Sequence, residues 1–183
     1  RQRQMCIRDR TSREALEIRE LPAKVVIIGG GATGAEFAHI YRTYGAEVTI
    51  IELLPRIVPL EDEDVSRELG RWMRKQGINV FSGAKLESAE LLKNAVEVTF
   101  QTEKHQEKCI KVEKLLMATG RAPNTKGIGL ENIGLQSDER GFVRVNEFMQ
   151  TSVQNIYAIG DIVPTPWLAH VASAEGIVAV EHI

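Results

Sequence analysis

The chain has 183 residues, of which 43% are hydrophobic and 26% charged, with 23 Lys and Arg against 25 Asp and Glu. This is ordinary globular composition; the balanced charge gives no basic face for nucleic acid, and no apolar run approaches the roughly 20 residues of a membrane span. Cys6 and Cys109 are too far apart in sequence for a paired metal motif or a disulfide framework, which favours a reduced, cytoplasmic setting.

The first ten residues differ in sequence pattern from the rest of the chain. They hold neither an apolar segment nor a small-residue cleavage site, so they do not form a secretory signal. Residues 5–10 resemble the translation of a sequencing adapter. We therefore interpret residues 1–10 as a cloning or assembly scar, with a disordered tail as the alternative, and we expect residues 11–23 to form a linker.

The next segment has the order strand, tight turn, helix, strand. Residues 25–28 are an apolar run too short for a helix and are followed by three glycines, which predicts a buried parallel strand. Apolar residues between positions 37 and 44 then recur at helical spacing until Gly45, a residue typical of a helix C-terminus. Residues 48–51 predict a second strand, so the segment forms a right-handed βαβ crossover.

A second helix follows, and its pattern is amphipathic. Val65, Leu69, Trp72 and Met73 are apolar at positions i, i+4, i+7 and i+8 among charged neighbours, and Gly77 ends the pattern. We expect these four side chains to face the core.

Alternating residues then indicate strands with one solvated face. Residues 96–100 and 110–112 alternate on either side of a polar turn at 101–106, which predicts an antiparallel pair, and residues 115–118 return the chain to a buried parallel strand. The predicted fold class is α/β: a Rossmann-type parallel sheet with an inserted antiparallel β-meander. Beyond it we expect a short strand at 156–159 and a helix from about His170.

The three glycines after the first strand form the pattern G-x-G-x-x-G at Gly29, Gly31 and Gly34. In dinucleotide-binding folds the first glycine permits a tight turn, the second lets a pyrophosphate approach the backbone, and the third lets helix and strand pack closely. The helix start then presents open N–H groups and its positive end to the phosphates. Glu52 ends the next strand, 23 residues after Gly29. A purely structural turn is the alternative, but strand, helix and acidic residue together predict a dinucleotide site.

Glu52 predicts which dinucleotide binds. Its carboxylate would accept hydrogen bonds from an adenosine ribose, whereas NADP would place a phosphate there. Two like charges about 4 Å apart repel by about 4 kcal/mol at an effective dielectric constant near 20. The sequence therefore predicts NAD rather than NADP. Arg56, four residues on, would soften this preference, but we interpret it as a solvated loop charge.

Further motifs carry a family resemblance. These motifs are residues 118–125 (ATGRAPNT), 151–161 (TSVQNIYAIGD), 167–170 (WLAH) and 175–176 (EG). Together with the glycine loop, they closely resemble the pyridine nucleotide-disulfide oxidoreductases, and within that family the dihydrolipoamide dehydrogenase group, from about residue 11 to residue 183.

The resemblance implies two cofactors, NAD and FAD. It implies an NAD-binding domain at 24–118 and a partial FAD-binding domain at 119–183. Asp161 would bind the ribityl or a nearby part of FAD, and a helix beginning near Leu168 would point its positive end toward the flavin. Taken alone, Asp161 could instead be a turn or cap residue and Trp167 a core residue. The implied NAD contacts are Gly29, Gly30, Gly31, Ala32, Thr33, Gly34, Ala35, Glu36 near the nicotinamide, Glu52, Leu86 and Gly120; the implied FAD contacts are Asp161, Trp167, Leu168, Ala169 and His170.

The resemblance also implies that the reacting groups lie outside this sequence. The family's C-x4-C pair and first glycine fingerprint do not occur here, its catalytic histidine belongs to a C-terminal interface domain, and we predict no catalytic or metal-binding residue in this chain. We expect a fragment of a dihydrolipoamide dehydrogenase that passes electrons between a dithiol/disulfide, FAD and NAD. Its disulfide substrate, a small molecule or a lipoyl domain, would bind through missing segments, and the full-length protein would be a homodimer.

The sequence leaves two alternatives open. The first is another flavoprotein reductase of the family, such as an NADH oxidase or a mercuric-type reductase. The second is a non-catalytic NAD-binding module.

Overall fold

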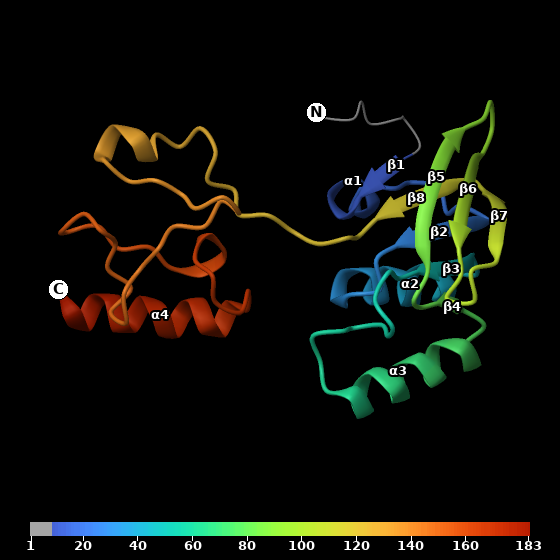
Figure 1. Cartoon of the computed structure of the whole chain (residues 1–183), viewed down its shortest axis with the longest axis horizontal. Coiled ribbons are helices and arrows are strands. Elements are labelled where there is room, and N and C mark those ends of the chain that lie inside the picture. Colours follow the sequence, from blue (N-terminus) through green and yellow to red (C-terminus); the bar gives the residue numbers. More distant parts are fainter. Residues whose placement is uncertain (1–8) are drawn as a thin grey trace. The chain divides into compact units, whose positions relative to one another are not determined.

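A computed structural model describes residues 9–183 of the chain (Figure 1). The segment interpreted as a scar, residues 1–10, lies outside the described residues except for Asp9 and Arg10. The chain divides into two compact units, the first ending at Gly120 and the second comprising Arg121–Ile183. Each unit has a hydrophobic core of its own.

The first unit is built on a parallel sheet of five strands, in the order β1-β8-β2-β3-β4. Every neighbouring pair in this sheet is parallel, which confirms the predicted Rossmann-type architecture. The strands are β1 (Asp9–Thr11), β2 (Lys24–Ile28), β3 (Glu47–Ile51), β4 (Asn79–Phe81) and β8 (Lys114–Met117).

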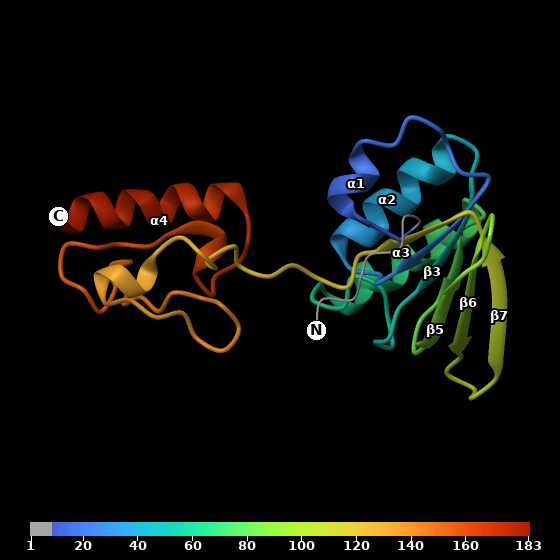
Figure 2. The same cartoon turned by 90° about the horizontal axis from the view of Figure 1, so that it is seen from above.

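Both faces of this sheet are buried, because successive side chains of a strand point to opposite faces. Val25 and Ile27 pack with helical residues such as Phe37 in one core cluster. Val26 and Ile28 pack with the antiparallel strands in a second cluster. Figure 2 shows α1 and α2 on one side of the sheet and the antiparallel strands on the other. The continuous apolar run of β2 thus reflects burial on two sides.

The antiparallel meander is confirmed as a separate three-stranded sheet, in the order β5-β6-β7. Its strands are β5 (Lys85–Leu91), β6 (Val96–Gln101) and β7 (Glu107–Val112). In β6 buried and half-buried residues alternate, as the pattern predicts. β5 was not evident from the sequence, because its inner positions alternate only weakly in hydrophobicity.

The helices of the first unit are α1 (Ser12–Leu16), α2 (Ala32–Thr43) and α3 (Glu63–Lys75). α1 lies within the segment 11–23 that we expected to be a linker, and Ala15 joins the core. α2 ends as predicted: Gly45 has a φ of 102°, and its N–H donates to the Arg42 carbonyl at 3.0 Å.

The buried face of α3 differs from the predicted one. Met73 is buried and Leu69 packs, partly buried, against the core, as predicted, but Val65 and Trp72 are 52% and 40% exposed, and the other buried positions are Ser66 and Gly70. Small residues face inward because the helix packs closely on the loop after β3. The Ser66 hydroxyl donates to the Val58 carbonyl at 3.1 Å, a contact that a bulky side chain at position 66 would prevent.

The second unit holds the 3₁₀ turns η1 (Leu130–Ile133) and η2 (Gly160–Ile162) and the helix α4 (Ala169–His182). α4 begins one residue before the predicted start. The strand predicted at 156–159 is wrong: Tyr157 makes only an isolated bridge with Gln150. Residues 121–183 form isolated bridges in place of a sheet, so this apolar run has no neighbouring strand to pair with.

A small core holds the second unit together. Val143, Ala158 and Val163 are buried, with Leu130 and Ile162 packed against them. Across residues 9–183, no helix is long and apolar enough to cross a membrane.

Candidate functional site

Two of the three fingerprint glycines are required by the packing of the protein itself. Gly29 has a φ of 101°, which disfavours any side chain, and a Cβ there would also clash with the Ala118 carbonyl. A Cβ at Gly34 would clash with the Gly29 carbonyl. These two positions therefore need glycine whether or not a ligand binds.

Gly31 is different, because nothing in the described part of the chain excludes a side chain there. Its φ is −69°, an ordinary value for any residue. A Cβ at this position would have no protein atom within 4 Å, among the described residues. Gly31 is the N-cap of α2, and its carbonyl accepts the first helical bond from the Ala35 N–H at 2.9 Å. The space next to Gly31 is open.

The start of α2 has backbone donors available. No side chain of the described residues caps this end of the helix. The N–H groups of a first helical turn have no intrahelical acceptor, and the helix dipole makes this end positive. Ala32 is exposed and Thr33 half-buried at this turn. The geometry suits an anionic group placed against Gly31.

Glu52 lies at the end of β3 and is only 7% exposed. One carboxylate oxygen accepts the Gly30 N–H at 2.5 Å, and the other accepts the Leu54 N–H at 2.7 Å. The carboxylate thus joins the glycine loop to the chain after β3. Sequence reasoning predicted only a ribose contact for Glu52 and missed this second role. Each carboxylate oxygen has a second lone pair, so a ribose hydroxyl can still be accepted.

The other residues predicted on the NAD side occupy varied places in the first unit. Ala35 is buried in the core, while Glu36 is exposed on the first turns of α2. Leu86 in β5 packs against the core cluster of the meander, so packing accounts for it. Gly120 is exposed, has a φ of 130° and ends the first unit.

In the second unit the structure brings Asp161 and Trp167 together through Arg121. The Arg121 guanidinium lies 3.5 Å from the Asp161 carboxylate and 4.8 Å from the centre of the Trp167 ring. The Phe142 ring packs against the Trp167 ring, with 5.7 Å between the two ring centres. Asp161 itself lies in η2 and is exposed. Arg121 was not selected from the sequence, although it stands within the motif at 118–125.

The last predicted residues stand at the start of α4. Leu168 is the N-cap, no side chain among the described residues caps this end, and Ala169 and His170 are exposed in the first turn. Further along α4, Glu175 is 6% exposed, and one of its carboxylate oxygens accepts the Gly160 N–H at 2.7 Å. Glu175 therefore holds the loop that carries Asp161. The sequence motif at 175–176 was the only signal for it.

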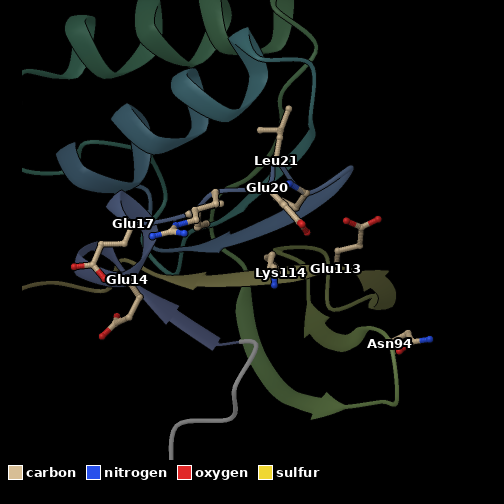
Figure 3. Close-up of a pocket in the computed structure, with 10 residues that line it drawn as sticks. Glu14, Glu17, Glu20, Leu21, Asn94, Glu113 and Lys114 are labelled. Atoms are coloured by element: carbon tan, nitrogen blue, oxygen red, sulfur yellow. The ribbon is translucent and has the colours of Figure 1, made fainter.

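A hollow of the first unit lies elsewhere. It has a volume of about 630 Å³ and lies beside Lys114, at the amino end of β8 (Figure 3). Ligands of open α/β sheets bind at the carboxyl ends of the strands, so we do not assign this hollow to the dinucleotide. Within the described residues, no group of three or more His, Cys, Asp and Glu side chains could hold a metal ion.

Comparison with known proteins identifies the family. Residues 2–176 match the family model described as Pyridine nucleotide-disulphide oxidoreductase. The chain belongs to this family. This pyridine nucleotide-disulphide oxidoreductase chain is 44% identical over 173 residues to dihydrolipoyl dehydrogenase of Bacillus subtilis, covering 94% of this chain and 36% of that protein. It is 42% identical over 174 residues to dihydrolipoyl dehydrogenase of Mycobacterium leprae, covering 94% of this chain and 37% of that protein.

Solved structures agree on the fold of this oxidoreductase chain. The HOCl-induced flavoprotein disulfide reductase RclA from Escherichia coli matches with a TM-score of 0.86 and 30% identity, over 98% of this chain and 40% of that chain. LpdA from Mycobacterium tuberculosis matches with a TM-score of 0.82 and 30% identity, over 94% of this chain and 37% of that chain. The present chain spans little more than a third of the length of the two dihydrolipoyl dehydrogenases from Bacillus subtilis and Mycobacterium leprae.

Proposed function

We propose that this chain supplies the NAD-binding part and a portion of the FAD-binding part of a dihydrolipoyl dehydrogenase, which passes electrons between a dithiol/disulfide, FAD and NAD. The identity of 42–44% to dihydrolipoyl dehydrogenases supports this activity. The disulfide substrate, a small molecule or a lipoyl domain, and a homodimeric assembly are part of the proposal.

Gly31 is the observation that carries the nucleotide assignment. Packing explains glycine at positions 29 and 34, but residues 9–183 leave the space beside Gly31 empty. A pyrophosphate approaching the backbone explains why a side chain is absent there. The N–H groups at the start of α2 would then donate to the phosphate oxygens, and Glu52 would hold the adenosine ribose.

The residues of the second unit fit a flavin. When bound, FAD supplies the electron-transfer chemistry, and the protein positions and tunes it. Asp161 would accept hydrogen bonds from ribityl hydroxyls, with Arg121 fixing its carboxylate. The uncapped start of α4 would stabilise negative charge that builds up on the flavin ring. Trp167 to His170 would lie along that ring.

Substitution of Gly31 by alanine tests the nucleotide assignment. We expect Gly31→Ala to fold with unchanged stability, because its Cβ meets no atom of the residues that the structure describes. We expect it to bind NADH at least about tenfold more weakly, because the methyl group occupies the phosphate position. NADH fluorescence titration measures the affinity, and thermal unfolding followed by circular dichroism measures the stability.

Thr43→Ser in the last turn of α2 is the matched control, since it changes one methyl group on the same helix at the end opposite Gly31, on an exposed side chain. NADH affinity should be unchanged in this variant. Equal NADH binding by Gly31→Ala and the unmodified chain would contradict the assignment.

A further inference from the structure

A second hollow lies beside α3, on the loop that follows β3. Its volume is about 310 Å³, and it also reaches Val80 of β4 and Ser82 just beyond it. Its lining is dominated by guanidinium groups. The charged lining residues are Arg56, Arg67, Arg71, Arg74 and Glu63.

The arginines of α3 are placed on one face of the helix. Arg67, Arg71 and Arg74 follow at spacings of four and three residues, and side chains at such spacings are neighbours on a helix. Arg67 pairs with Asp64, and Arg71 pairs with Glu68 at 2.5 Å. Arg74 has no carboxylate within 4.0 Å among the residues the structure describes. Like charges this close repel, so an anion between them would lower the energy.

Arg56 closes the hollow from the other side and is incompletely satisfied. Its Nη1 is 3.9 Å from the Glu63 carboxylate, and its Nη2 donates to the Pro59 carbonyl at 3.4 Å. Its Nε is buried and has no hydrogen-bond partner in the described part of the chain. A buried donor without an acceptor is costly, and more so on a charged group. Arg56 is thus a loop charge that is only partly solvated: 42% of its side chain is exposed, whereas its Nε is buried.

Small residues make room for these guanidinium groups. A Cβ at Gly70 would lie 3.4 Å from Arg74 Nη1 and 3.9 Å from Ile57 Cδ1. Because glycine has no side chain, the Arg74 guanidinium can lie over this position. The other side of Ile57 faces the glycine loop, since its Cγ2 lies 2.9 Å from the Cβ position of Gly30. One side chain thus separates the hollow from the loop.

We propose that this hollow, lined by Arg56, Arg67, Arg71 and Arg74, is a binding site for a phosphate group. Guanidinium forks match the geometry of phosphate oxygens and form the strongest hydrogen bonds when both groups are charged. A hollow of about 310 Å³ suits a small anion or one nucleotide group rather than a protein segment. The proposal stands on the arginines and does not depend on the function assigned to the glycine loop. Two sources carry this chemistry: a phosphate on a nucleotide held at the glycine loop, and a separate phosphorylated ligand.

Titration calorimetry with inorganic pyrophosphate at low ionic strength tests the site. The variant is Arg74→Gln, and the matched control is Lys75→Gln, which changes the net charge equally on the same helix but does not line the hollow. We expect pyrophosphate to bind the unmodified chain, Arg74→Gln to bind it at least about tenfold more weakly, and Lys75→Gln to bind it unchanged. Circular dichroism checks that all three chains are folded.

The Gly31→Ala variant locates the anion. Undiminished pyrophosphate binding in this variant supports the arginine site, whereas loss in Gly31→Ala with full binding in Arg74→Gln places the anion on the glycine loop and overturns the proposal. Absence of pyrophosphate binding to the unmodified chain, or equal losses in Arg74→Gln and Lys75→Gln, also overturns it. NADH affinity is a separate readout, so failure of the nucleotide assignment would be visible independently.

Competition experiments distinguish the two sources of phosphate. If NADPH displaces pyrophosphate and Arg74→Gln weakens NADPH but not NADH, the phosphate belongs to the nucleotide. If saturating NADH leaves pyrophosphate binding intact and Arg74→Gln leaves NADPH affinity unchanged, the ligand is a separate anion. Both outcomes support a phosphate site at the arginines.

Discussion

At the scale of single residues, the three fingerprint glycines have three distinct physical reasons to be glycine. Gly29 is constrained by backbone conformation, Gly34 by contact with a neighbouring carbonyl, and Gly31 by neither. The same substitution of glycine by alanine should therefore have different effects at these positions. At position 31 it should weaken nucleotide binding and leave stability unchanged, whereas at position 34 it should lower stability.

Gly34→Ala is the structural counterpart of Gly31→Ala. Its Cβ would meet the Gly29 carbonyl inside a packed strand and helix, so the backbone must shift. We expect the free energy of unfolding to fall by about 1–3 kcal/mol, the usual cost of overpacking. Urea unfolding measures this. A variant as stable as the unmodified chain would show that α2 can move away from β2 at little cost.

Glu52 combines stability and specificity in one carboxylate. Glu52→Gln places an amide NH₂ where one of the two N–H donors, of Gly30 or Leu54, needs an acceptor. We expect the free energy of unfolding to fall by about 1–3 kcal/mol, the cost of a buried unsatisfied donor. The ratio of NADH to NADPH affinity should fall as well, because the charge that repels a ribose phosphate is gone. Urea unfolding and fluorescence titration provide the two readouts, and an unchanged affinity ratio would contradict the role in specificity.

At the scale of elements, α3 carries a glycine that the helix itself does not need. Gly70 lies in the helix interior, and a Cβ there makes only contacts of 3.4 Å or more, the nearest with the flexible Arg74. Glycine costs a helix interior about 0.5–1 kcal/mol relative to alanine. We expect Gly70→Ala to raise the free energy of unfolding by this amount in urea unfolding.

Gly45→Ala is the contrasting substitution at a helix end. Its φ of 102° is a left-handed conformation, although a Cβ there has no atom of residues 9–183 within 4 Å. Alanine in such a conformation costs about 1–2 kcal/mol. We expect Gly70→Ala to raise the free energy of unfolding and Gly45→Ala to lower it. Changes of the same sign would contradict helix propensity as the reason at position 70 or backbone conformation as the reason at position 45.

The turn that contains Asp138 should make the second unit sensitive to acid. The Phe142 N–H bonded to its carboxylate holds the pKa of Asp138 below the ordinary 3.8, with a smaller contribution from the Arg140 N–H. A folded-state pKa below the unfolded value means that the carboxylate stabilises the turn above about pH 4, and that this stabilisation is lost as the pH falls further.

Trp167 fluorescence reports this loss, since Phe142 packs on its ring. In urea titrations, the free energy of unfolding of the second unit should fall between pH 5 and pH 3 in the unmodified chain. It should fall less in Asp138→Ala. The same pH dependence in both chains would show that another group is responsible.

At the scale of the whole molecule, the two units have separate cores of unequal size. The first unit holds two core clusters, on the two faces of its sheet, whereas the second holds one cluster, with Val143, Ala158 and Val163 as its buried members. Burial of apolar surface is the main stabilising contribution, so the second unit should be the less stable one.

Each unit contains one of the two tryptophans of the chain, Trp72 in the first and Trp167 in the second. Trp72→Phe leaves a reporter on the second unit, and Trp167→Phe leaves one on the first. We expect the Trp167 transition at a lower urea concentration than the Trp72 transition. Coincident transitions would show that the units unfold as one cooperative body.

Much of the first unit could be predicted because local patterns there agree with the tertiary environment. Residues 25–28 are apolar throughout, and both faces of β2 are in fact buried. α3 shows where such reasoning ends. Its apolar residues Val65 and Trp72 suggested one face, but close packing on the loop after β3 selected Ser66 and Gly70 instead. Hydrophobic periodicity records apolar character and does not record the distance between backbones.

The second unit was harder to predict, because its contacts join distant parts of the sequence. The apolar run at 156–159 predicted a strand, but a strand needs a neighbour, and here only Tyr157 finds one, in Gln150. Arg121 and Asp161 are 40 residues apart and meet only after folding.

The sequence by itself determined the βαβ order, the glycine fingerprint, the position of Glu52 and the family, because turns, strand periods and helix ends depend on neighbouring residues. Only the tertiary structure decided which fingerprint glycine is left without a protein contact, that Glu52 clamps the glycine loop, and that four arginines converge beside α3. Those features depend on which backbones approach each other, and close approach is set by packing between segments far apart in the chain.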